Sequence, residues 1–382
     1  MDTARALHII IIAAVVLAAV LGAGYWYIVG FPGWLSLPAP LTTAFYDNLH
    51  IGLQLGNKDY ASGTNALRAG NYEDAMDAFK QALAATDGPE SQVAIKSKIG
   101  ISAARAGDTL TAISVFKEIA ASPVSTVDRA RAYAIQQLGY AHYYNGHKPE
   151  VEAALFADAE YARFVVQGDA LLSARNIFEY AASIYPLAEA EIQVANYYAN
   201  QLVAHKNGTK PLEKDTLDEY WNEVQDRFRS AEKDIAFMRQ SAAYQLQLWN
   251  ALGQKALVLG KLTEAGYVSE SETNAAFEEI IPLFATLKTG ADGNSRYYYA
   301  VSVARIHGQA GAEKVRSLLR PLYTDPQYKG SFIEKTLSDP TFGIRKQARN
   351  ITLLSSLDSA FKDYLVRLGW SAEDFAAAAA AR

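Results

Sequence analysis

Three serines precede a lysine by three residues, a spacing at which a lysine amine can activate a serine hydroxyl as a nucleophile. The pairs are Ser114/Lys117, Ser230/Lys233 and Ser359/Lys362, and a Lys-Thr-Gly sequence lies at 288–290. Acyl enzymes that use this spacing also need a Ser-Asp-Asn element, which is absent here, and a strand to carry Lys-Thr-Gly. We therefore interpret the pairs as polar residues on helix surfaces and predict no catalytic residue.

The sequence contains no pattern typical of a metal or cofactor site either. The chain has 6 histidines and no cysteine, which excludes thiolate zinc sites, iron–sulfur clusters and disulfides. His142 and His147 lie near each other, but their spacing puts them on different faces of a helix, and no carboxylate completes a ligand set. The prediction is that the chain holds no metal and no cofactor and is not an enzyme. An enzyme with an unrecognised carboxylate site stays open as an alternative, because such carboxylates need no local motif.

The net charge of the chain indicates whether nucleic acid is an expected partner. With 36 Lys and Arg against 41 Asp and Glu, the formal net charge of the 382-residue chain is −5. Nucleic-acid-binding domains are typically basic, with pI values above about 9. We therefore expect no nucleic-acid partner.

Residues 9–31 form an apolar segment without a charged residue. A helix of about 20 residues crosses the hydrocarbon core of a bilayer, so residues 1–31 are predicted to form a transmembrane signal anchor. Tyr25, Trp26 and Trp34 are aromatic residues of the kind found at the membrane interface. A cleavable signal peptide is the alternative, although its apolar region usually has only about 7–15 residues.

The orientation follows from Arg5 and the amino terminus, which precede the apolar segment. The positive-inside rule then predicts a cytoplasmic N-terminus and a body on the exported, periplasmic or extracellular, side. Residues 32–55 contain prolines and glycines that end the helix and form a linker. We thus expect a single-pass membrane protein that contacts the lipid bilayer through residues 9–31.

After residue 55, apolar residues recur at helical spacing, as in Ala75, Ala78, Phe79 and Ala82, and no segment has the alternation of a strand. The prolines between 89 and 340 are expected to separate helices of ordinary length. Helices are predicted around 170–185, 188–205, 271–289, 295–308, 311–323 and 343–368, with two longer ones between 216 and 261. The fold class is therefore predicted to be all-α.

Two segments within this body repeat each other. Gly63, the turn at Gly70-Asn71 and Phe79 recur as Gly100, the turn at Gly107-Asp108 and Phe116, each 37 residues later. A looser third copy has Gly139 and Gly146, and a later one has Gly253 and Gly260. Glycine at the first position permits close helix approach, and at the second it permits a turn with positive φ. Such units bury their apolar faces only by stacking, so at least about three are needed.

The pattern resembles the tetratricopeptide repeat, most clearly over residues 56–122. The resemblance implies that the transmembrane helix is followed by an α-solenoid of antiparallel helix pairs. We predict repeats over 56–206, a polar loop at 207–215 and a C-terminal helical-repeat lobe over 216–382. The family's aromatic residue in the first helix is replaced by Asp59 and Lys96, so these repeats are divergent.

The resemblance also implies that the first helix of each unit lines a concave groove for a partner. Counted from the glycines of each copy, the groove positions are Tyr60, Thr64, Arg68, Ile101, Arg105, Tyr133, Gln136, Tyr140, Tyr143 and Tyr144. Tyrosine, present 23 times, gives a large contact area with a polar end, which suits peptide capture. For any single tyrosine, core packing is the alternative.

These features predict a membrane-anchored protein–protein interaction scaffold or adaptor, in an export, assembly or envelope machine. The alternative is a structural subunit of a larger membrane or cell-surface assembly, which would form a homo-oligomer. Asn207 and Asn350 match the N-glycosylation pattern and matter only if the host glycosylates exported proteins.

Overall fold

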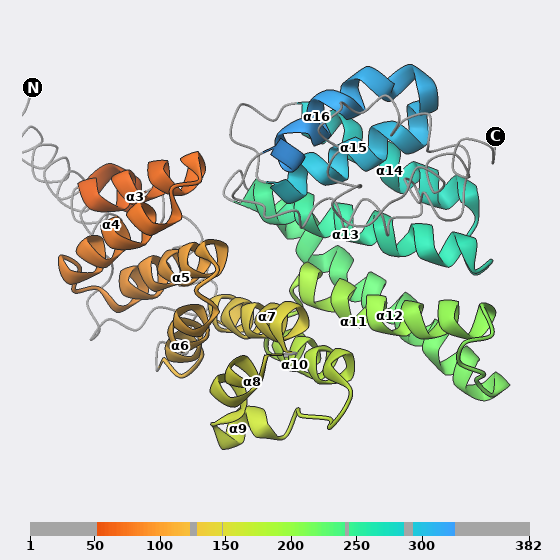
Figure 1. Cartoon of the computed structure of the whole chain (residues 1–382), viewed down its shortest axis with the longest axis horizontal. Helices are drawn as coiled ribbons and strands as arrows, with labels where there is room; N and C mark the ends of the chain where they lie inside the picture. The colour runs from red at the N-terminus through yellow and green to blue at the C-terminus, as the bar shows by residue number, and fades with distance from the viewer. Residues whose placement is uncertain (1–51, 123–127, 147, 241–243, 286–292, 325–382) are drawn as a thin grey trace, which may run out of the picture. The chain divides into compact units, whose positions relative to one another are not determined.

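The computed structural model describes residues 52–122, 128–146, 148–240, 244–285 and 293–324 (Figure 1). Within these ranges the regular structure is helical and contains no strand, so the predicted all-α class is confirmed. The chain divides into two compact units, residues 1–187 and residues 188–382.

The described part of the first unit contains helices that pack in chain order. Their bounds are α3 Lys58–Ala69, α4 Tyr72–Ala84, α5 Pro89–Ala106, α6 Thr109–Ala120, α7 Asp128–Asn145, α8 Pro149–Phe156, α9 Ala159–Ala162 and α10 Ala170–Ile184. From α3 to α7 each helix packs against the next, which gives the helix pairs of an α-solenoid-like order (Figure 1). Short connections make successive helices antiparallel, so α3, α5 and α7 run in the same direction.

Local sequence signals fix where these helices begin and end. The side-chain oxygen of Asn57 accepts hydrogen bonds of 3.1 and 3.0 Å from two N–H groups of the first turn of α3. Gly70 and Gly107 follow α3 and α5 with φ of 84° and 86°, which confirms the predicted glycine turns. Pro89 and Pro149 occupy the first turn of α5 and α8, where a missing N–H costs no helix hydrogen bond.

A glycine in the first helix of each pair faces an aromatic ring in the second. A β-carbon added to Gly63 would lie 2.8 Å from the Phe79 ring, and one added to Gly100 would lie 2.7 Å from the Phe116 ring. Both rings are buried. The predicted close approach at these glycines is therefore present, and it sets the helix separation in both pairs.

The third pair has the same contact but a different second helix. A β-carbon on Gly139 of α7 would lie 2.8 Å from the ring of Phe178, which belongs to α10 and not to α8. The aromatic partner of the third glycine therefore comes from α10, and α8 and α9 lie between α7 and α10 in the chain. Helices α8 and α9 form an insertion, held to α6 where the Lys117 amine pairs with Asp158 at 2.6 Å.

The described part of the second unit is also entirely helical. The bounds are α11 Ala188–Lys206, α12 Lys214–Met238, α13 Gln245–Glu264, α14 Glu270–Ala285, α15 Gly293–His307, the 3₁₀ turn η2 Gly308–Gly311 and α16 Ala312–Thr324. The helices predicted from the sequence over this region all occur, apart from the one at 343–368, which lies outside the described residues. Pro282 and Pro321 lie inside α14 and α16, so these two prolines do not separate helices as predicted.

Helices α11 and α12 pack against each other through buried acidic side chains. Glu191 is only 4% exposed, and it pairs with Arg227 at 3.2 Å and accepts a 2.7 Å hydrogen bond from the Ser230 hydroxyl. Asp234 accepts a 2.9 Å hydrogen bond from the N–H of Ala188 at the start of α11. Most of the predicted polar loop 207–215 connects these two helices, and its last two residues begin α12. The units divide between residues 187 and 188.

The late glycine repeat is only partly confirmed. A β-carbon on Gly253 would lie 2.3 Å from the side chain of Tyr298, so this glycine does mark a close helix contact. Gly260, in contrast, lies inside α13, and the glycine with positive φ is Gly266, at 82°. The turn predicted at Gly260 is therefore wrong.

The predicted membrane segment, residues 9–31, lies outside the described residues. Among the residues that the structure does describe, no helix combines the length and apolar character needed to cross a bilayer.

The glycine–aromatic contacts predict opposite effects for two glycine-to-alanine changes. Gly63→Ala should lower the free energy of unfolding by about 1–3 kcal/mol, because the methyl group overlaps the Phe79 ring. Gly260→Ala is the matched control: its nearest neighbour would be 3.8 Å away, so it should raise helix stability by about 0.5–1 kcal/mol. Urea unfolding followed by circular dichroism measures both, and an unchanged midpoint for Gly63→Ala would contradict the packing role.

Candidate functional site

The predicted groove residues lie on three helices of the first unit. Their positions are Tyr60, Thr64 and Arg68 on α3, Ile101 and Arg105 on α5, and Tyr133, Gln136, Tyr140, Tyr143 and Tyr144 on α7. Because these helices run in the same direction, their C-terminal ends lie at the same end of the unit.

Two of the predicted groove residues belong to the core instead. Tyr60 is 2% exposed, and its ring packs edge-on against Phe79 with centroids 5.4 Å apart. Burial raises the pKa of its hydroxyl, which therefore stays protonated. Gln136 is 1% exposed. The side chain of Thr64 is half-buried, and its hydroxyl donates to the Tyr60 carbonyl at 2.9 Å.

The tyrosines near the end of α7 form one aromatic group. Tyr144 is 64% exposed and stacks on Tyr140, with centroids 6.2 Å apart and planes 13° apart. Tyr143 is 37% exposed and meets Tyr144 edge-on at 5.0 Å. The ring of Tyr140 in turn packs edge-on against the ring of Phe178, with centroids 5.0 Å apart. The inner ring thus supports the outer two, which present an apolar surface with hydroxyl groups to solvent.

The anchor glycine of each first helix gives a common reference for comparing surfaces. The three glycines make the same contact with an aromatic ring, so residues at equal distances after them occupy equivalent positions. Five residues after the glycine, α3 has Arg68, α5 has Arg105 and α7 has Tyr144, and all three are exposed. We call these three residues the exposed row.

Lys98 lies close to the two arginines of the exposed row. It is a partly buried residue of α5, and burial, followed by the charges of Arg105 and Arg68, lowers the pKa of its amine to about 8. Within the described residues, no carboxylate forms an ion pair with Lys98. Lys98 is not one of the predicted groove positions, although it precedes Arg105 by two helical turns.

Two of the residues considered for catalysis, Lys117 and Ser230, make structural contacts. Lys117 pairs with Asp158 and donates a 2.6 Å hydrogen bond to the Ala154 carbonyl, and the Ser230 hydroxyl donates to Glu191. The third pair, Ser359/Lys362, lies outside the described residues, as does 288–290. The described residues contain no group of three or more His, Asp or Glu side chains placed to hold a metal ion.

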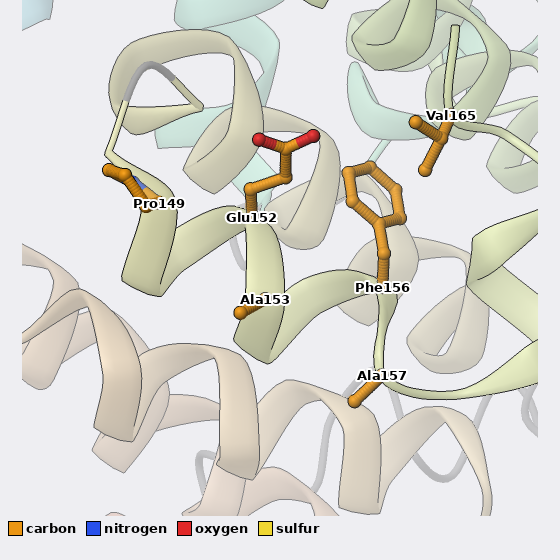
Figure 2. Close-up of a pocket in the computed structure, with 6 residues that line it drawn as sticks. All are labelled: Pro149, Glu152, Ala153, Phe156, Ala157 and Val165. Carbon is orange, nitrogen blue, oxygen red and sulfur yellow. The ribbon is translucent and has the colours of Figure 1, made fainter. Parts of the chain in front are cut away.

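A hollow of about 350 Å³ lies over α8 and the segment that follows it. Its lining residues are Pro149, Glu152, Ala153, Phe156, Ala157 and Val165. Figure 2 shows Glu152 and Phe156 rising from the same side of α8, with Val165 near the Phe156 ring. One exposed carboxylate and an apolar wall provide too few converging polar groups to define a specific ligand.

The structure describes one of the two predicted glycosylation acceptors. Asn207 is exposed in the turn between α11 and α12, and Asn350 lies outside the described residues.

Comparison of the chain with known protein families, curated proteins and solved structures found no match.

His142 is a buried titratable residue next to the hollow. It is 3% exposed, neither ring nitrogen has a hydrogen-bond partner, and its ring meets Phe156 edge-on at 5.1 Å. Burial lowers the pKa of His142, and the Glu152 carboxylate partly opposes that shift. The insertion α8 thus packs on a histidine that is neutral at pH 7.

Acidification should therefore destabilise this packing. The pKa of His142 is lower in the folded chain than in the unfolded chain, so protons bind the unfolded form more readily below about pH 6.5. Stability present at pH 7.5 should be lost as the pH falls, by up to about 1.4 kcal/mol per pH unit. Urea unfolding from pH 7.5 to 5 should show this loss, and it should be smaller in His142→Leu. Parallel pH profiles for the two proteins would contradict it.

Proposed function

We propose that this chain is a membrane-anchored protein–protein interaction scaffold whose helical pairs resemble tetratricopeptide repeats. The exposed row is the observation that supports the proposal most strongly. Core packing explains why glycine occurs at the anchor positions. It does not explain why the position five residues later carries a large, exposed side chain on α3, α5 and α7.

The composition of this surface favours a protein partner. Arg and Tyr are the residue types that most often dominate the binding energy of protein interfaces. Tyr143 and Tyr144 are already held by ring contacts with each other, and Tyr144 also stacks on Tyr140. Binding then restricts fewer side-chain rotamers, which reduces its entropic cost.

The anchor and the orientation belong to the same proposal. Residues 9–31 hold the chain in a bilayer, the N-terminus lies in the cytoplasm, and the body stands on the exported side, where it assists an export, assembly or envelope machine. The apolar, uncharged sequence of this segment supports the anchor, and Arg5 supports the orientation.

Site-specific photo-crosslinking tests the binding surface. A photoreactive phenylalanine analogue at position 144 should crosslink a defined partner in native membranes, because Tyr144 belongs to the exposed row. The matched control is the same analogue at position 80, because Lys80 is exposed on α4, a second helix of the same unit. Tyr143→Ala should reduce crosslinking from position 144 several-fold without changing helicity.

Other outcomes of this experiment discriminate between functions. Equal crosslinking from positions 80 and 144 would contradict a binding surface at the exposed row. A product of twice the chain's mass would instead favour the homo-oligomeric structural subunit.

Deletion of residues 9–31 tests the anchor. The full chain should stay in the membrane fraction after carbonate extraction, whereas the deletion variant should move almost completely to the supernatant. Added protease should degrade the body from outside the cytoplasmic membrane. A body protected until that membrane is lysed would contradict the orientation, and a full chain released by carbonate would contradict the anchor.

A further inference from the structure

Helices α8 and α9 take no part in the contact that holds α7 to α10. That contact is made by Gly139 and Tyr140 with the ring of Phe178. The insertion instead packs on α6 and α7 through α8, whose inward residues Val151 and Leu155 are 2% and 0% exposed. The insertion can therefore leave α6 and α7 without breaking a glycine–aromatic contact.

The chain that follows α9 is attached to α10. The Phe164 carbonyl accepts a 3.3 Å hydrogen bond from the side-chain amide of Asn176, and the N–H of Val166 donates to the Ser173 hydroxyl at 2.8 Å. The part that can move as one element is therefore residues 148–162, which comprise α8 and α9. We call these residues the strap.

The α9 end of the strap is held by ion pairs whose carboxylates are exposed. Asp158 pairs with Lys117 of α6 at 2.6 Å, and Glu160 pairs with Arg131 of α7 at 3.9 Å. Glu160 also accepts a 2.7 Å hydrogen bond from the Tyr180 hydroxyl of α10. The two carboxylate side chains are 57% and 44% exposed. Ion pairs at such positions contribute little stability, because water and salt screen them.

Buried polar atoms without a hydrogen-bond partner occur where the strap meets the rest of the unit. They are both ring nitrogens of His142, the hydroxyl of Tyr161 and the Nε atom of Arg131. A buried polar group without a partner costs free energy, which is regained when the group meets water. Release of the strap should therefore cost much less free energy than unfolding of the whole unit.

His142 is the side chain in this contact that can gain a charge at mildly acidic pH. It is 3% exposed and meets the ring of Phe156, and the charge of Glu152, on the same side of α8, acts on it (Figure 2). Burial lowers the pKa of His142, and Glu152 opposes this shift only in part. A proton therefore binds more readily when the strap has left and the imidazole is in water, so acid favours the released form.

We propose that residues 148–162 form a strap that leaves α6 and α7 when His142 takes up a proton, while the glycine–aromatic helix pairs of the first unit stay folded. Release uncovers the surface of α6 and α7 against which Val151 and Leu155 are buried at neutral pH. The strap gives the chain a response to pH that goes beyond the scaffold function and needs no partner at the exposed row.

Thiol labelling of the full chain in detergent measures release of the strap. The chain has no cysteine, so one introduced thiol reports on one position. Leu155→Cys places the thiol on the buried face of α8, and Ala75→Cys, at an equally buried position of α4, is the matched control. At pH 5, labelling by 4,4′-dithiodipyridine, divided by the rate of the same variant in urea, should be at least tenfold faster at position 155. Equal protection of the two thiols would show that only the whole unit opens and would overturn the strap.

Histidine variants in the Leu155→Cys background test the role of the proton. From pH 7.5 to 5 the relative labelling at position 155 should rise at least fivefold, and His142→Leu should remove most of this rise. His307→Leu, which removes an exposed histidine of the second unit, should leave the rise unchanged. Glu152→Gln should enlarge it, because the protonated imidazole in the docked form loses a favourable charge. A rise that persists in His142→Leu would overturn the proton as the trigger.

Hydrogen exchange of the chain without an introduced cysteine covers the case in which Leu155→Cys itself detaches the strap. At pH 5 the protection factors of the α8 amides should be at least tenfold below those of the α4 amides. They should rise several-fold between pH 5 and 7.5, and this rise should be smaller in His142→Leu. Amides of α8 as protected as those of α4 at pH 5 would contradict release of the strap.

Discussion

The missing side chain at one position of α3, α5 and α7 is the constraint on which the first unit depends. At each of these glycines a methyl group would lie within 2.8 Å of a phenylalanine ring, well inside van der Waals contact. The backbone of the first helix therefore approaches the ring directly, which brings the paired helices close together and buries the ring. A larger residue fits only if the ring or one of the helices moves.

This contact also decides which residues reach the surface. Once the anchor glycine faces its ring, the rotation of each first helix is fixed, since an α-helix has 3.6 residues per turn. Tyr60, three residues before Gly63, then lies in the core against Phe79, whereas Arg68, five residues after it, is exposed. The contact between each anchor glycine and its ring therefore determines both the packing inside the helix pair and the exposure of the residues in the exposed row.

The second unit contains buried polar contacts between its helices. Glu191 is buried with Arg227 and Ser230 as partners, and the Lys261 amine donates hydrogen bonds of 2.8 and 3.0 Å to Asn196 and Asn200. Burying such polar groups costs free energy unless each of them has a hydrogen-bond or ion-pair partner. The partners must therefore face each other, which restricts the register of α11 against α12 and α13. The second unit combines these polar contacts with the close approach of Gly253 to the ring of Tyr298.

Local sequence placed most of the helices, because capping residues, glycine turns and apolar periodicity act within a few residues. Gly70 and Gly107 show this, since positive φ there was predicted and found. Which distant helix completes a pair was not determined locally: α10 supplies Phe178 to Gly139, and the intervening α8 and α9 carry no equivalent ring. Tyr60 and Tyr144 were both predicted groove residues, but only the tertiary structure separates the buried ring from the exposed one. The physical reason is that residue type and spacing fix the face of a helix, whereas exposure depends on what packs over that face.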